Sequence, residues 1–85
     1  MSVTIKYFAW LRERVGKAEE DMILPAGVNT LTELIAHLRR QGEEYDHAFA
    51  TDGVIRAALD KRHVPLDAAI GGAREIAFFP PMTGG

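Results

Sequence analysis

The chain has 85 residues, enough for one domain, because so short a polypeptide has no material for a second hydrophobic core. Hydrophobic residues make up 47% of it and charged residues 26%, a balance typical of a folded globular protein. The net charge of -2 gives no reason to expect a nucleic acid or an anionic membrane as partner. Cysteine is absent, which excludes disulfides, zinc-thiolate sites and a cysteine nucleophile.

Two predicted strands flank a short predicted helix in the first third of the chain. Residues 3–8 alternate β-branched or aromatic side chains with polar ones, which is typical of a strand with one buried face. Residues 9–15 have a spacing that suits one or two helical turns, and Gly16 follows as a C-cap. A second strand is expected over 20–24, where Pro25 stops it because proline cannot donate a hydrogen bond to a sheet.

The clearest predicted element is an amphipathic helix that begins after Thr30 and ends near Gly42. Thr30 and Glu33 have the spacing of a capping box. Apolar residues then recur at intervals of three and four, which places them on one helix face: Leu31, Leu34, Ile35 and Leu38. From Gly42 to Gly53 the chain is polar, and it predicts a loop or a weak helical turn anchored by two aromatic residues, Tyr45 and Phe49.

The second half of the chain predicts short strands separated by turns. Strands are expected over 54–59 and 63–64, with a turn between them and Pro65 closing the second. The last strand, over 75–79, has a nearly continuous apolar run that suits a central strand covered on both faces. This order of elements predicts an α+β domain in which one mixed sheet packs on one main helix, the β-grasp arrangement.

The last six residues form a segment unlike the rest: Pro80, Pro81, Met82, Thr83, Gly84 and Gly85. Two prolines cannot extend a sheet, so we expect a domain over 1–79 and a tail over 80–85. The prolines stiffen the root of this tail, whereas the two glycines can enter a channel too narrow for a Cβ atom. That shape suits an arm that an enzyme takes up as its substrate.

The terminal carboxylate indicates what chemistry such an arm can undergo. Its pKa of about 3.5 leaves it ionised at neutral pH, so it can attack the α-phosphate of ATP and form an acyl-adenylate. A sulfur nucleophile reaches the adenylate carbonyl only if that carbonyl is sterically open, and Gly85 leaves it open. The alternative is that the Gly84-Gly85 ending is a frayed end or a cloning remnant without function.

Two segments carry a resemblance to a known family. Residues 75–85, EIAFFPPMTGG, resemble the ending of the small subunit of molybdopterin synthase, the MoaD family, and residues 7–16, YFAWLRERVG, are similar to its first strand and short helix. Length and element order fit the family along almost the whole chain. The sequence departs from it at residues 71–74, where an acidic turn is common, and at Asp60, where asparagine is common. Neither departure touches the tail.

The resemblance implies a function for the tail and a set of interface residues. In the family the terminal glycine is adenylated by a ubiquitin-activating-like enzyme, converted to a thiocarboxylate and inserted into the large synthase subunit. Sulfur then passes to a pterin precursor and forms the dithiolene of molybdopterin. Gly84 and Gly85 would carry this chemistry. The partner interface would comprise Phe8, Arg12, Phe79, Pro80, Pro81, Met82 and Thr83.

The resemblance also implies the partners of the chain. They are the large subunit, in a heterotetramer with two copies of it, the adenylating enzyme, and a cysteine desulfurase or rhodanese-like sulfur donor. ATP would be used by the activating enzyme, and we expect no cofactor or metal bound tightly to this chain and no catalysis by the chain alone. The N-terminus lacks the regions of a signal peptide and no apolar run approaches a membrane span, so a cytoplasmic location is expected.

Three alternative functions remain open from the sequence. One is a sulfur carrier for thiazole synthesis or another pathway, and the second is a protein modifier joined through Gly85 to lysine side chains. The third is a β-grasp interaction module whose tail is inert.

Several other residues are given no function by their pattern. His37, His47 and His63 lack the spacing of metal ligands, so no zinc site is predicted. The acidic run 19–21 is interpreted as a solvated strand edge rather than a docking face. An aromatic residue in a strand is more often in the core than at an interface, and only the resemblance places Phe8 and Phe79 at one.

Overall fold

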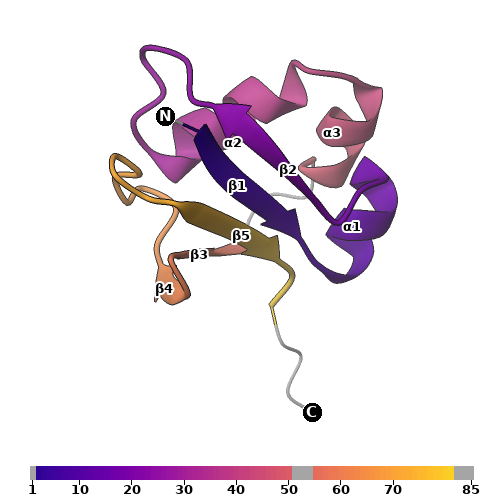
Figure 1. Cartoon of the computed structure of the whole chain (residues 1–85). Coiled ribbons are helices and arrows are strands. Elements are labelled where there is room, and N and C mark those ends of the chain that lie inside the picture. Colours follow the sequence, from indigo (N-terminus) through magenta and orange to yellow (C-terminus); the bar gives the residue numbers. More distant parts are fainter. Residues whose placement is uncertain (1, 51–54, 82–85) are drawn as a thin grey trace.

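The computed structural model describes residues 2–50 and 55–81, and Figure 1 shows the path of the chain. In this part of the chain the elements follow in this order: β1 (Ser2–Tyr7), α1 (Ala9–Val15), β2 (Glu19–Ile23), α2 (Leu31–Arg39), α3 (Glu43–Ala48), β3 (Arg56–Leu59), β4 (Arg62–Val64) and β5 (Glu75–Phe79). The strands form a five-stranded sheet in the order β2-β1-β5-β3-β4. Only β1 and β5 are parallel among these neighbours. The mixed sheet predicted from the sequence is therefore confirmed.

Side chains on each strand alternate between two faces of the sheet, because successive residues of a strand point in opposite directions. The inner face bears the apolar residues of the two central strands, all of them at most 2% exposed: Val3, Ile5, Tyr7, Ile76 and Phe78. Helix α2 packs on this face through three side chains that are fully buried: Leu31, Leu34 and Leu38. Helices α1 and α3 add residues to the same core. Thr4 and Lys6 of β1 point to the outer face. No helix of the described residues covers that face (Figure 1).

The beginning of α2 follows the sequence prediction closely. The Thr30 hydroxyl accepts a hydrogen bond from the Glu33 N–H at 3.2 Å, and a Glu33 carboxylate oxygen accepts one from the Thr30 N–H at 3.0 Å. These bonds satisfy two donors that the first helical turn leaves without a partner, and they form the predicted capping box. The helix ends at Arg39, shortly before the predicted end near Gly42. It is not long or apolar enough to cross a membrane, and neither is any other helix in residues 2–50 and 55–81.

The segment after Gly42 is a helix, where the sequence predicted a loop or a weak helical turn. Its predicted anchors are correct, because Tyr45 is 8% exposed and Phe49 is 1% exposed. The Phe49 ring meets the Phe78 ring edge to face, with 5.2 Å between centroids. These contacts with the sheet stabilise a helix too short to persist by itself. Val54, the first residue of the predicted third strand, lies outside the described residues.

The last strand occupies the centre of the sheet, as its apolar run predicted, and its three middle residues are buried on both faces of the sheet, although no helix of the described residues lies over the outer face. Ile76 and Phe78 point into the core, whereas Ala77 and Phe79 point to the outer face. These two outward residues make the apolar run continuous. In the described residues no second layer of helices covers them.

Candidate functional site

The parallel pairing of β1 with β5 determines where the tail begins. Tyr7 is the register partner of Phe78, and the Phe8 N–H donates a hydrogen bond to the Phe78 carbonyl at 3.1 Å. Parallel strands end at the same edge of a sheet, so Phe8 and Phe79 both emerge there, one residue beyond the pair. Figure 1 shows the chain leaving β5 at the end where β1 passes into α1. Pro80 is the first residue of the predicted tail.

The sequence predicted Phe8 as the last residue of the first strand. In the structure it belongs instead to the loop between β1 and α1. It is the N-cap of α1, and its carbonyl accepts hydrogen bonds from the N–H groups of Leu11 at 3.1 Å and Arg12 at 3.4 Å. Its own side chain is 46% exposed, an unusual value for so large an apolar group. Arg12 is exposed one helical turn later. The fold therefore brings Phe8 and Arg12 to the edge from which the tail emerges.

Phe79 and the two prolines are half-buried at the same edge. The Phe79 ring lies against the His63 ring of β4, with 5.0 Å between centroids, and Arg56 of β3 is its register partner. The sequence pattern predicts no function for His63 or Arg56. Strand alternation alone could place Arg56 on a solvated face, but its position beside Phe79 depends on the pairing of β3 with β5, which the sequence does not reveal.

Four of the predicted site residues lie outside the described residues: Met82, Thr83, Gly84 and Gly85. The structure therefore describes the root of the tail and not its end. At this root the fold gathers the remaining candidates: Phe8, Arg12, Phe79, Pro80 and Pro81.

One residue of the acidic run on β2 does not behave as a solvated strand edge. Glu20 accepts hydrogen bonds from the hydroxyls of Tyr7 and Tyr45 through Oε2, both at 2.7 Å, and its Oε1 lies 3.5 Å from Nζ of Lys17. Burial raises the pKa of the Tyr7 phenol, and the hydrogen bond and charge of Glu20 raise it further. This cluster joins α3 to β1 and β2, so Glu20 has a structural role that involves three elements of the fold.

The pKa values of the other two members of this cluster are also raised. Burial is the main cause for Tyr45, although a hydrogen bond with Lys17 acts in the opposite direction. For Lys17 the hydrogen bond with Tyr45 is the main cause, followed by the charge of Glu20. The two hydroxyls therefore stay protonated and the ammonium stays charged at neutral pH, which is the state in which all three donate to their partners.

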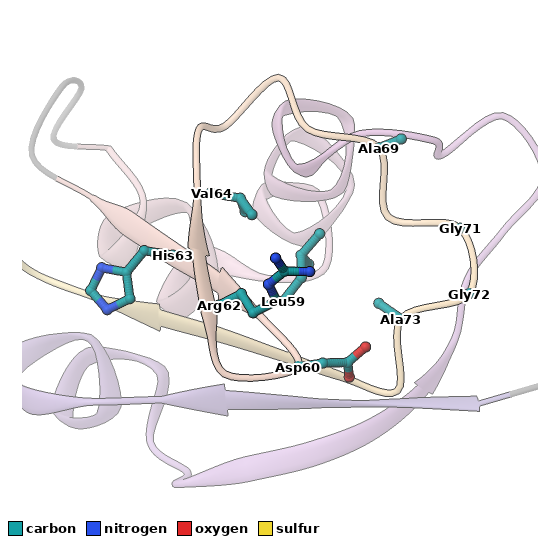
Figure 2. A pocket seen from close by; sticks show the side chains of 9 residues that line it. All are labelled: Leu59, Asp60, Arg62, His63, Val64, Ala69, Gly71, Gly72 and Ala73. Carbon is teal, nitrogen blue, oxygen red and sulfur yellow. The ribbon is translucent and has the colours of Figure 1, made fainter.

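A surface hollow of about 370 Å³ lies at the other end of β5 from the tail. Its lining comes from the β3–β4 hairpin and from the loop that precedes β5: Leu59, Asp60, Arg62, His63, Val64, Ala69, Gly71, Gly72 and Ala73. Figure 2 shows Arg62 over the hollow and the His63 ring on the opposite side of β4. Asp60 is already engaged, because one carboxylate oxygen accepts the N–H groups of Arg74 and Glu75 at 3.0 and 2.9 Å. Within residues 2–50 and 55–81 no cluster of acidic or histidine side chains could hold a metal ion.

A mixed sheet with a parallel central pair, one capped main helix and a tail that begins beside the first strand define a β-grasp protein. Residues 5–85 match the ThiS family, and the chain belongs to this family. It is similar to the molybdopterin synthase sulfur carrier subunit of Haemophilus influenzae, with 31% identity over 87 residues that cover 98% of this chain and 99% of the relative. The subunit of that name from Escherichia coli is 32% identical over 83 residues, with the same coverage. The resemblance found in the sequence is thus confirmed.

Two solved structures show the same fold. SAMP1 from Haloferax volcanii has a TM-score of 0.76 with 23% identity and covers the whole of both chains. A chain of the complex between subunits 1 and 2 of the molybdopterin-converting factor from Helicobacter pylori has a TM-score of 0.62 with 24% identity, again over both whole chains. The predicted ubiquitin-like β-grasp fold is therefore confirmed.

Proposed function

We propose that this chain is the sulfur carrier subunit of a molybdopterin synthase and that the carboxyl group of Gly85 carries the sulfur. Two curated relatives with that name match along nearly their whole lengths, which supports the assignment. The observation that carries it is the position of β5. The strand directly before the tail is the central strand of the sheet, paired on both edges, and it ends beside the exposed Phe8 side chain.

This position gives the tail a rigid base and a long reach. β5 is held by hydrogen bonds to β1 and β3, so the direction in which Pro80 leaves is determined by the sheet. If a partner binds the six residues in an extended conformation, they span about 20 Å, which is enough to reach a buried active site. The exposed Phe8 ring and the half-buried Phe79 ring supply apolar surface for docking beside that base.

The proposed reaction has three steps. In the adenylating enzyme, a carboxylate oxygen of Gly85 attacks the α-phosphorus of ATP and displaces pyrophosphate. A persulfide from a cysteine desulfurase or rhodanese-like donor attacks the resulting carbonyl and displaces AMP. A thiol then cleaves the sulfur–sulfur bond, which leaves a thiocarboxylate on Gly85 and a disulfide on the donor side. In this scheme the chain supplies the group that reacts, its partners supply the catalytic residues, and the process takes place in the cytoplasm.

The large subunit of the synthase is the proposed final partner. In the Helicobacter pylori factor, subunit 1 forms a complex with subunit 2. We expect the same arrangement here, with the tail inside the large subunit and the root residues Phe8, Arg12, Phe79, Pro80 and Pro81 at the interface. Sulfur then passes from Gly85 to the pterin precursor.

The intact mass of the protein tests the carrier chemistry. The full chain is incubated with ATP, an adenylating enzyme of proven activity on another carrier and a persulfide donor, beside a variant that lacks Gly85. We expect a mass increase equal to the exchange of one oxygen for sulfur in the full chain alone. No increase would contradict the proposal, and conjugates of higher mass on a denaturing gel would indicate a protein modifier instead.

A further inference from the structure

The outer face of the sheet has two halves that differ in charge. On the β1–β2 side, charged and polar groups are paired with one another: Nζ of Lys6 lies 3.1 Å from a Glu75 oxygen, and the Thr4 hydroxyl donates to Asp21 at 2.7 Å. On the β3–β4 side, the outward positions hold no carboxylate. They are Arg56, Ala58 and His63. The second half therefore carries one positive charge, that of Arg56, with no carboxylate among its outward strand residues, and it is the half that borders Phe79.

Two alanines on this face are buried although no helix within residues 2–50 and 55–81 covers them. Ala58 is 6% exposed and Ala77 is 8% exposed. The register places Ala58 between His63 on β4 and Ala77 on β5. Because the Ala58 side chain ends at Cβ, the imidazole of His63 can extend across β3 and contact Phe79, and their rings are tilted by 53° at 5.0 Å between centroids. A residue of the far edge strand thus becomes part of the surface at the root of the tail.

Arg56 completes this surface. It is exposed and is the register partner of Phe79 on the outer face, so Phe79 has a guanidinium on the neighbouring strand and an imidazole against its ring. Arginine and aromatic side chains are those in which the binding energy of interfaces is concentrated. Arg56, His63 and Phe79 are called the β3–β5 surface below.

We propose that the β3–β5 surface docks against a carboxylate-bearing region of the large subunit of molybdopterin synthase. This inference rests on the proposed function, under which that subunit receives the tail. A protein that encloses Pro80 and the residues after it must cover the side chains next to Phe79. A planar guanidinium binds a carboxylate through two parallel N–H groups, and an imidazole N–H supplies another donor. A basic partner surface would instead be repelled by Arg56.

Charge reversal on the two faces of the β3–β4 hairpin tests this proposal. Arg56→Glu reverses a charge on the β3–β5 surface. Arg62→Glu makes the same change on β4, but Arg62 is paired with Leu59 and lies over the hollow on the opposite face, so it is a matched control (Figure 2). The affinity of each full chain for purified large subunit is measured by titration calorimetry at two salt concentrations, and urea unfolding verifies that each variant folds.

We expect Arg56→Glu to weaken the complex about tenfold or more, because it places a carboxylate against carboxylates. Arg62→Glu should change the affinity less than about twofold, as rim or remote charges do. His63→Ala should weaken binding, and His63→Gln, which keeps an N–H donor, should weaken it less. The affinity of the unsubstituted chain should fall as salt rises, and Arg56→Glu should lose much of that dependence.

Three results would overturn the proposal. If Arg56→Glu and Arg62→Glu both bind as tightly as the unsubstituted chain, the β3–β5 surface is not part of the interface, and the carrier function is unaffected. If Arg56→Glu weakens only the complex with the adenylating enzyme, the occupant of the surface is that enzyme. If the unsubstituted chain acquires sulfur on Gly85 but binds no large subunit, the carrier chemistry holds and the proposed partner is wrong.

Discussion

The two faces of the sheet differ in the burial and polarity of their side chains, although the same strands form both. On the inner face, Ile5, Ile76 and Phe78 are completely buried against the helices. The outer face holds alanines, the exposed Ile23 and charged or polar groups whose contacts are accessible to water, such as the pair of Lys6 and Glu75. Burial of large apolar groups dominates folding free energy, whereas exposed ion pairs contribute little to it. Stability therefore resides in one face, and the other is available for partners.

The sharpest test of this division compares two adjacent phenylalanines. Phe78→Ala removes a fully buried ring from the inner face and should lower the free energy of unfolding by about 3–5 kcal/mol. Phe79→Ala, one residue later on the outer face, should lower it by less than half as much. Urea unfolding measures both, and Phe78→Leu gives a smaller loss if the alanine variant does not fold. Equal losses for Phe78→Ala and Phe79→Ala would contradict the division.

The Tyr7–Glu20–Tyr45 cluster predicts a loss of stability at high pH. The pKa of Tyr7 is raised in the folded protein, so the unfolded chain loses its proton first, near pH 10. The stabilising contribution is therefore complete below about pH 10 and decreases above it, by up to about 1.4 kcal/mol per pH unit. Urea unfolding between neutral pH and pH 11 measures this decrease. Tyr7→Phe should show a shallower decrease, and the same slope in both proteins would disprove the assignment to Tyr7.

The capping box of α2 predicts a moderate effect at the edge of the inner layer. Thr30→Ala removes the hydroxyl that accepts the Glu33 N–H, and the free energy of unfolding should fall by about 1 kcal/mol. Thr30→Ser keeps the hydroxyl and should retain most of the stability. Thermal and urea unfolding of the three proteins provide the comparison. A serine variant as unstable as the alanine variant would show that the cap is not the cause.

The smallest effect is expected from the ion pair on the outer face. A double-mutant cycle with Lys6→Gln and Glu75→Gln should give a coupling energy below about 0.5 kcal/mol, since both side chains are accessible to water. Added salt should reduce the coupling further. A coupling above about 1.5 kcal/mol would mean that the outer face contributes to stability much as a buried network does.

The sequence predicted the parts of the fold that depend on local interactions. The Thr30 cap and the Gly16 C-cap, in the left-handed conformation at φ 88°, follow from residues within a few positions of one another. The apolar run of β5 correctly indicated a central strand, because a strand paired on both edges is shielded. The helical nature of α3 was not resolved, since its stability comes from Tyr45 and Phe49 packing on distant strands.

The candidate site was predictable only in part for the same reason. The tail was recognised from residues close together in the sequence, whereas only the resemblance to the MoaD family pointed to Phe8 and Phe79. The contact of His63 with Phe79 joins positions separated by two strand pairings, and no local pattern encodes it. Glu20 was misread because its two tyrosine partners lie 13 and 25 residues away along the chain. Partners at such separation become visible only in the folded molecule.

The central position of β5 also has a consequence for synthesis of the protein. Without this strand the remaining pairings are β1 with β2 and β3 with β4, two hairpins that share no backbone hydrogen bonds in the described residues. The ribosome makes β5 after all the other described elements, so the complete sheet forms only once the strand that leads into the tail has emerged. A chain interrupted before residue 75 therefore lacks the strand that joins the two strand pairs, and the root of the tail is made together with the complete sheet.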